Sequence, residues 1–200
     1  MSILLPNAPA GAIDVLRLPS PSITVRAMRP ADADRLQDHV RGLSRASRQN
    51  RFLGGVNELP ASELERMTGR GDGHVFGLFA EAVVRGETQV VGEAVYAVQA
   101  DRGLAEFALS VADAWQGRGV GQALIASLEC RALRAGSLML TGETLRTNEA
   151  MLALAAKSGF VVRRHPEEAR LVRLEKVIGA FQGLTPAARL NGMHWGRAAA

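Results

Sequence analysis

The hexapeptide Gln116-Gly117-Arg118-Gly119-Val120-Gly121 decides the fold of this chain. It follows an apolar run, residues 107–111, and precedes a helical pattern over residues 122–134. A glycine-rich turn that opens a helix exposes backbone N–H groups without partners in the helix, and the helix dipole favours negative charge there. Glycines also let the backbone come close to a phosphate, because no Cβ intervenes. The turn therefore predicts a site for a phosphorylated cofactor, with a plain structural turn as the alternative.

Two common phosphate-binding motifs do not fit this turn. A P-loop for ATP or GTP requires a lysine directly after its last glycine, and none follows Gly121. The glycines are spaced G-x-G-x-G, whereas a dinucleotide-binding turn has the spacing G-x-G-x-x-G and usually lies in the first βα turn of the chain. Nucleotide triphosphates are thereby excluded, and a dinucleotide is disfavoured.

Three segments, in order, resemble the GNAT acyltransferases, which use acetyl-CoA. The turn is similar to the family's pyrophosphate-binding signature Q-x-x-G-x-G. Residues 148–160, from Asn148 to Phe160, resemble the helix and exit N-x-x-(A/M)-x-x-L-Y-x-K-x-G-F. Residues 105–111 resemble the strand that carries a catalytic glutamate in several protein-acetylating members. The resemblance covers residues 23–175 and implies acetyl-CoA as cosubstrate.

The remaining pattern predicts an α/β (α+β) fold with a single domain. Apolar residues at helical spacing, Ala33, Leu36, Val40 and Leu43, follow Pro30 and indicate a first helix. A loop rich in serine and arginine is expected over residues 44–55. The other expected elements are strands over 23–26, 74–84, 89–98, 104–111, 138–145, 160–164 and 169–178, and helices over 60–67, 122–134 and 148–159.

This order gives a mixed, mostly antiparallel sheet of about seven strands flanked by about four helices. It matches the GNAT fold, in which the strand before the glycine turn splays from the next strand and leaves a V-shaped gap. Residues 23–179 are expected to form the GNAT domain. The proline-bearing residues 1–22 indicate an extended or disordered arm, and residues 180–200 a C-terminal tail or weak helix.

Composition excludes several classes of function. Hydrophobic residues make up 47% of the chain, enough for a sizeable core. No apolar run of ~18 residues exists, so no membrane helix is expected, and the N-terminus lacks the pattern of a signal peptide. The single cysteine, Cys130, cannot form an internal disulfide and fits a reducing cytoplasm. The net charge is +4, but arginines alternate with acids, so no nucleic-acid partner is predicted. Both a monomer and a homodimer remain open.

Glu106 is the candidate general base. An amine is mostly protonated at neutral pH, since the reference pKa of lysine is ~10.4, and a carboxylate whose pKa is raised by burial can accept its proton. Glu106 matches the family's glutamate by its place in the strand, and Phe107 should point to the opposite face. A solvent-facing glutamate is the alternative for Glu106, and Glu93 is the alternative base.

The resemblance also implies the cosubstrate-binding residues. Backbone groups of Leu109, Ser110 and Val111 would hold the acetyl carbonyl and the pantetheine arm, and a donor aimed at that carbonyl would stabilise the oxyanion. Arg118 would add a charged contact or be a solvated arginine, and Asn148 would contact CoA, cap its helix, or do both. The complete expected set is Leu109, Ser110, Val111, Gln116, Gly117, Arg118, Gly119, Val120, Gly121 and Asn148.

One departure from the family concerns the general acid. Many members have a tyrosine at the position of Ala155, whereas the single tyrosine here, Tyr96, lies in a different strand. The thiolate would then leave without a protein acid, which its pKa near 8.5 allows, or with Ser110 or a water as donor. The histidines, His39, His74, His165 and His194, lack metal-ligand spacing, so no metal site is predicted, and His39 is expected at the surface.

A fourth segment bears on the acceptor. Residues 43–52, from Leu43 to Phe52, resemble the L-S-x-x-S-x-x-x-R-F segment of bacterial protein lysine acetyltransferases, with a family-specific packing loop as the alternative. The leading hypothesis is therefore an acetyl-CoA-dependent N-acetyltransferase acting on a protein lysine. Its alternatives are acetylation of a small-molecule amine, an acyl-CoA-binding regulatory module, and a nucleotide-dependent oxidoreductase.

Overall fold

Eight strands form one sheet in the computed structural model, which describes residues 14–16, 23–70, 74–99 and 103–179. Their order is β1-β2-β3-β4-β5-β6-β8-β7, and only the β5–β6 pair is parallel. The mixed, mostly antiparallel sheet is thus confirmed. The strands are β1 (Asp14–Leu16), β2 (Ile23–Ala27), β3 (Val75–Val84), β4 (Glu87–Gln99), β5 (Leu104–Val111), β6 (Met139–Leu145), β7 (Val161–Arg164) and β8 (Leu171–Val177).

The eighth strand, β1, lies in the segment that was expected to be an extended arm. It pairs antiparallel with β2, from Asp14 opposite Val25 to Leu16 opposite Ile23. The other residues of that arm, and the expected tail over residues 180–200, lie outside the described residues.

Five α-helices flank the sheet, one more than the sequence pattern predicts. They are α1 (Ala33–Gly42), α2 (Arg45–Phe52), α3 (Ala61–Glu65), α4 (Val120–Arg134) and α5 (Glu149–Lys157). The prediction of a loop over residues 44–55 is wrong because residues 45–52 form α2. Its N-cap, Ser44, accepts a hydrogen bond from the Ser47 N–H, and both hydroxyls donate to Asp113, far along the chain. No residue of α2 is fully buried, so the helix leaves no apolar periodicity in the sequence.

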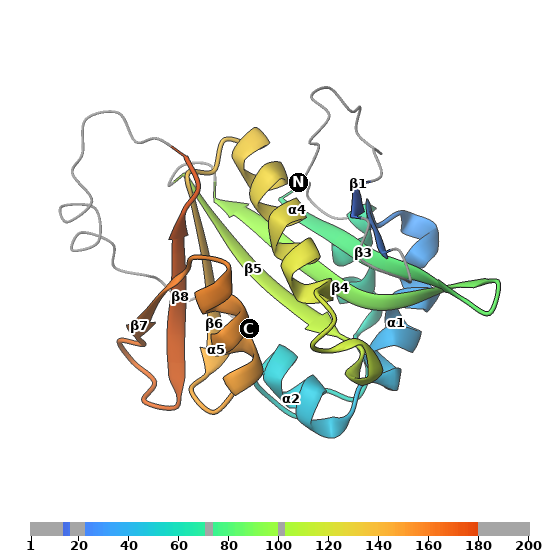
Figure 1. Ribbon diagram of the computed structural model, residues 1–200, viewed down its shortest axis with the longest axis horizontal. Helices are drawn as coiled ribbons and strands as arrows, with labels where there is room; N and C mark the ends of the chain where they lie inside the picture. The colour runs from blue at the N-terminus through green and yellow to red at the C-terminus, as the bar shows by residue number, and fades with distance from the viewer. Residues whose placement is uncertain (1–13, 17–22, 71–73, 100–102, 180–200) are drawn as a thin grey trace.

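The helices form two layers with the sheet between them (Figure 1). α4 crosses β2 to β5 on one face and buries Leu124 and Leu128 against that face. α1 and α3 cover the opposite face, where Leu36 and Val40 surround Phe79 of β3. Between β5 and β6 the sheet opens, and the candidate active site lies at this opening.

β5 and β6 diverge along their length. Their parallel register runs only from Leu104 opposite Met139 to Glu106 opposite Thr141, although both strands continue. Just past the last paired position the strands are still close. A Cβ on Gly142 would lie 2.9 Å from the Phe107 ring and 3.0 Å from the Phe107 carbonyl oxygen. The predicted V-shaped splay is therefore confirmed, and the edge of β5 after Glu106 is open to a ligand.

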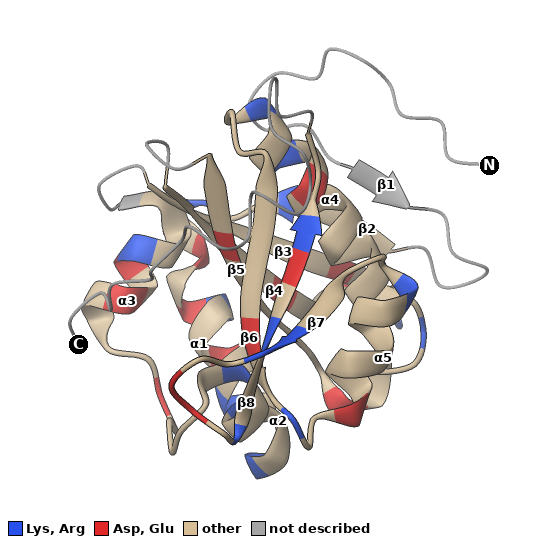
Figure 2. Cartoon of the chain, turned by 90° about the vertical axis from the view of Figure 1, so that its left-hand side faces the viewer, with Lys and Arg blue, Asp and Glu red and all other residues tan. Residues whose placement is uncertain are grey.

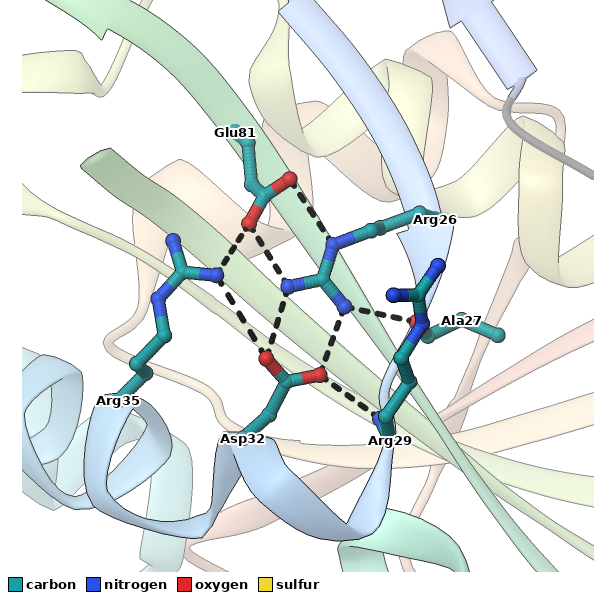
Figure 3. Close-up of polar contacts among 6 residues, drawn as sticks. All are labelled: Arg26, Ala27, Arg29, Asp32, Arg35 and Glu81. Carbon is teal, nitrogen blue, oxygen red and sulfur yellow. Dashed lines mark hydrogen bonds and ion pairs between the residues drawn. The ribbon is translucent and has the colours of Figure 1, made fainter. Parts of the chain in front are cut away.

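An ion cluster joins β2, β3 and the start of α1 (Figure 3). The Arg26 guanidinium donates from all five N–H groups: two to Asp32, two to Glu81 and one to the Ala27 carbonyl, at 2.7–3.0 Å. Both carboxylates are buried, and Arg35 donates to Glu81 at 2.7 Å. The Arg26 hydrogen bonds hold the pKa of Asp32 below its ordinary value, and those from Arg26 and Arg35 outweigh burial to lower the pKa of Glu81.

Gly77 on β3 marks a close approach of two segments. A Cβ there would lie 2.3 Å from the Met67 carbonyl oxygen and 2.5 Å from the Met28 sulfur. Gly77→Ala is therefore expected to lower the free energy of unfolding by about 1–3 kcal/mol, as overpacked cores do, in urea unfolding measurements. Gly42→Ala is the matched control, because nothing lies within 4 Å of its added Cβ and alanine favours a helix. Equal effects at the two positions would contradict a steric cause.

Membrane-spanning helices and metal-binding clusters are both absent from the parts of the chain that the structure describes. None of the described helices combines the length and apolar composition of a membrane span. Nor do three or more His, Cys, Asp or Glu side chains gather there in a way that would hold a metal ion; His194 lies outside the described residues.

Candidate active site

A cleft of about 360 Å³ occupies the splay between β5 and β6, and we call it the splay cleft. α2, α4 and α5 contribute to its walls. Of the ten expected cosubstrate-binding residues, eight line this cleft: Leu109, Ser110, Val111, Gln116, Gly117, Gly119, Gly121 and Asn148. The other two are not part of its wall. Arg118 is exposed, with its guanidinium 5.4 Å from the Trp115 ring centroid, and Val120 is buried in the core.

The glycine turn forms the rim of the splay cleft at the start of α4. Gly117 and Gly119 have φ values of 72° and 85°, in the left-handed region that disfavours side chains. Gly121 is needed for a different reason, because a Cβ there would lie 2.7 Å from the Leu154 side chain of α5. The first turn of α4 thus reaches the cleft with N–H groups that an α-helix leaves unpaired.

Two side chains of the expected motifs brace this rim. The Gln116 amide donates to the Val111 carbonyl at 3.1 Å and to the Ser47 hydroxyl at 3.2 Å, which joins the turn to β5 and α2. The Asn148 side chain accepts from the Met151 N–H at 3.1 Å and donates to the Thr144 hydroxyl at 3.0 Å. The interpretation of Asn148 as a helix N-cap is confirmed, and its place on the cleft wall remains compatible with a ligand contact.

A buried polar network lies beneath the cleft. Glu93 on β4 is fully buried and pairs with Arg51 of α2, with 2.6 Å between Oε1 and Nε. The Ser110 hydroxyl donates to the same Glu93 oxygen at 2.8 Å and lies 3.0 Å from His39 Nε2. Glu93 lines neither cavity described here, and its carboxylate is committed to these partners, so its geometry does not suit a general base.

The prediction of a surface position for His39 is wrong. Its ring is buried, and burial lowers its pKa although the nearby Glu93 charge opposes the shift. His39 follows Leu36 by three residues and precedes Val40, so it lies on the inward stripe of α1. That spacing was the signal in the sequence that could have placed it in the core.

A second cavity of about 800 Å³, which we call the acidic groove, adjoins the splay cleft. Four carboxylates line it, those of Glu58, Glu63, Glu106 and Glu143, together with two guanidinium groups, those of Arg51 and Arg66. Both arginines are paired with carboxylates, Arg51 with Glu93 and Arg66 with Glu63. Figure 2 looks onto this side and shows acidic segments on α3, β5 and β6.

The two cavities meet at Arg51, Phe107, Ala108 and Glu143, which line both of them. Glu106 lies beside this junction, in the wall of the acidic groove, and Phe107 is buried on the opposite face, as the strand alternation predicts. Glu106 keeps an exposed surface, as its solvent-facing alternative predicts. Desolvation by the surrounding groove wall, and secondly the negative charge of Glu143, nevertheless raise its pKa, while Arg173 acts in the opposite direction. A carboxyl of this kind accepts a proton more readily near neutral pH than an ordinary glutamate.

Tyrosine is absent from both cavities. Ala155, at the family's tyrosine position, is fully buried, and Tyr96 stacks on Phe76 with ring centroids 5.1 Å apart. The sequence reasoning did not identify Glu143, which the junction brings next to Glu106. Its only signal was an acidic residue within the apolar pattern of residues 138–145.

Comparisons with known proteins agree with this geometry. Residues 43–160, more than half of the chain, match the acetyltransferase (GNAT) family. An acetyltransferase of Pseudomonas aeruginosa, PA5475, is 29% identical over 150 residues, which cover 75% of this chain and 81% of that protein.

Solved structures show the same fold. The GNAT domain of S. lividans PAT has a TM-score of 0.73 at 26% identity and covers 82% of this chain and 96% of its own. YncA of Salmonella typhimurium, solved with its cofactor acetyl-CoA, has a TM-score of 0.59 at 19% identity and covers 80% and 96%. On the family match and the shared fold, this chain belongs to the acetyltransferase (GNAT) family.

Proposed function

We propose that this acetyl-CoA-dependent N-acetyltransferase acts on the side-chain amine of a protein lysine, with Glu106 as general base. The observation that carries the proposal is the junction of the two cavities. It gives a thioester in the splay cleft and an amine in the acidic groove one place to meet, beside a carboxyl with a raised pKa.

The splay cleft suits acetyl-CoA along its length. The pyrophosphate would accept hydrogen bonds from the N–H groups of residues 117–121, at the positive end of the α4 dipole. Beyond Glu106, β5 no longer pairs with β6 but still pairs with β4. Over Leu109, Ser110 and Val111, the backbone groups that face away from β4, apart from the Val111 carbonyl bound by Gln116, are therefore available to the amides of the pantetheine arm. An N–H of this edge would also stabilise the oxyanion that forms when the thioester carbonyl is attacked.

The acidic groove suits a cationic, extended acceptor. Its two arginines are paired with carboxylates, and two of its four carboxylates, Glu58 and Glu63, are paired with arginines. Glu106 and Glu143 at the junction are left to attract an ammonium group. Glu106 would take one proton from the ammonium, and the neutral nitrogen would attack the acetyl carbon to form the tetrahedral oxyanion. When this intermediate collapses, the carbon–sulfur bond breaks, and the second proton of the nitrogen passes to the departing sulfur or to water. The thiolate leaves without a tyrosine donor, which its pKa near 8.5 permits. The groove volume of about 800 Å³ accommodates a peptide segment rather than a lysine alone.

Thermal unfolding with added ligands tests the cosubstrate first. A ligand that binds only the folded state stabilises it by ~2.7 kcal/mol at 100 times its Kd. Acetyl-CoA and CoA are expected to raise Tm, and NAD and ATP to leave it unchanged. Transfer to a lysine peptide is then compared with transfer to free butylamine by mass spectrometry. A preference for butylamine would replace the protein acceptor by a small amine, and binding without any transfer would favour a regulatory module.

A further inference from the structure

The acidic residue that faces Glu106 across the splay, Glu143, has no role in the reaction outlined above. We propose that Glu143 is a second carboxylate of the acceptor site, which binds the acceptor ammonium beside Glu106, and that His165 is the residue that positions it. The proposal rests on the amine acceptor of the proposed function and adds the group that recognises its charge.

The position of Glu143 follows from strand register. Glu106 pairs with Thr141 at the last β5–β6 position, and Glu143 lies two residues further on β6, on the same face as Thr141. It therefore stands just where the strands separate. Glu106 lines the acidic groove but not the splay cleft, whereas Glu143 lines both cavities. An ammonium group approaching the thioester from the groove would pass between these two carboxylates.

His165, in the turn between β7 and β8, holds Glu143 by a hydrogen bond whose direction follows from the contacts of the ring. The buried His165 ring accepts two backbone hydrogen bonds at Nδ1, from the N–H groups of Glu167 at 3.2 Å and Glu168 at 2.8 Å. Nδ1 is thus an acceptor, so Nε2 bears the hydrogen and donates it to Glu143 Oε1 at 3.0 Å. A second proton on the ring would break both backbone bonds. In this tautomer His165 donates the hydrogen bond that orients Glu143.

Glu143 has a second contact within the protein, and it falls on the same carboxylate oxygen as the first, so the other oxygen is left for a ligand. Arg173 of β8 approaches the same Oε1, at a longer 3.4 Å. Within the described part of the chain, Oε2 has no hydrogen-bond partner, and about a third of the side chain is exposed at the junction. One oxygen is fixed by the protein, and the residue lines the place where the two cavities meet.

The charged groups around the junction favour a cation there. Besides Glu106 and Glu143, these are Arg173 on β8 and, across the groove, the ion pairs Arg51–Glu93, Arg66–Glu63 and Arg41–Glu58. The cross-groove arginines are each balanced by a carboxylate. The negative charge of Glu143 also contributes to the raised pKa of Glu106, as expected for carboxyl groups that share one site.

Glu143→Gln tests the proposal, because glutamine keeps an acceptor for His165 and loses only the charge. Binding of a lysine peptide to the CoA-loaded protein, measured by calorimetry, is expected to weaken about fivefold to tenfold, as for a partly exposed charge pair. The affinity for CoA should not change. The acid limb of kcat/KM should move to lower pH, because Glu106 loses a neighbouring negative charge. Glu87→Gln, on the β3–β4 hairpin, controls for loss of one carboxylate elsewhere.

Two substitutions of His165 separate positioning from folding. Asparagine can keep the Asx-type bonds to the backbone N–H groups but is too short to reach Glu143, whereas glutamine can carry its N–H to Glu143. His165→Asn is expected to raise the KM for the peptide with kcat and Tm near wild type, and His165→Gln to restore KM. Equal KM values for both variants and the wild type would overturn the positioning role.

One measurement needs no turnover, so it distinguishes failure of this inference from failure of the proposed function. The Glu106 carboxyl is titrated by ¹³C NMR in the wild type and in Glu143→Gln. A lower pKa in the variant, with weaker peptide binding, supports the carboxylate pair even if no transfer occurs, in which case only the proposed reaction fails. An unchanged Glu106 titration with unchanged peptide affinity overturns the inference whether or not the enzyme turns over.

Discussion

Arg26→Met is expected to lower the free energy of unfolding by about 3–5 kcal/mol, the range found when one partner of a buried ion pair is removed. Arg26 satisfies two buried carboxylates through paired hydrogen bonds. The variant leaves both carboxylates with the partly exposed Arg35, and Asp32 also with the Arg29 N–H. Native proteins are stable by about 5–15 kcal/mol, so this loss is a large share of the total. Urea unfolding followed by circular dichroism measures it, provided that the m value stays constant.

The pH dependence of the same variant checks the cause. Asp32 and Glu81 have pKa values below their ordinary values in the folded protein, so their contribution to stability is complete above the unfolded pKa, about 4, and is lost as pH falls through the lowered values. The difference between wild type and Arg26→Met should therefore be largest near neutral pH and shrink in acid. Arg41→Met removes an exposed ion pair with Glu58 and should change stability little. A pH-independent loss in Arg26→Met would point to packing instead.

The order of elements along the chain was predictable because it depends on local patterns, whereas the splay was expected from the resemblance to the GNAT family. Each of these local patterns needs only a few neighbouring residues. They are the glycine turn between a strand and a helix, the alternation at Glu106 and Phe107, and the short connections around β3, β4 and β5. The helix α2 was not predictable in this way. It is polar, and its Ser44 and Ser47 are held by Asp113, which reaches them only in the folded chain.

The acceptor side depends on contacts that no local pattern records. Glu143 meets His165 only because β8 inserts between β6 and β7 in the sheet, so residues distant in sequence become neighbours. In the sequence Glu93 was the alternative base to Glu106, because it is also a glutamate in an apolar strand. The difference arises from Arg51, which α2 brings over Glu93 and not over Glu106.

Glu106→Gln is expected to lower kcat by about 10²–10⁴, the usual contribution of a positioned general base. Glutamine preserves the size of the side chain and cannot accept the proton of the attacking ammonium. Acetyl-CoA affinity should stay at the wild-type value, because Glu106 lines the acidic groove and not the splay cleft. Steady-state transfer to a lysine peptide, with acetyl-CoA binding by calorimetry, measures both quantities.

The pH dependence of kcat/KM in the wild type is a second test of Glu106 as the general base. Glu106 must be deprotonated to act as a base, so kcat/KM should fall as pH decreases through its pKa, which lies above the ordinary glutamate value because of desolvation by the groove wall and the charge of Glu143. Glu106→Gln should lose this acid limb along with its rate, and Glu106→Asp, which keeps the carboxylate at a shorter reach, should retain the limb at reduced kcat. If Glu93→Gln removes the limb in a folded protein while Glu106→Gln keeps it, the base is Glu93, and the junction of the cavities is not where the proton is taken.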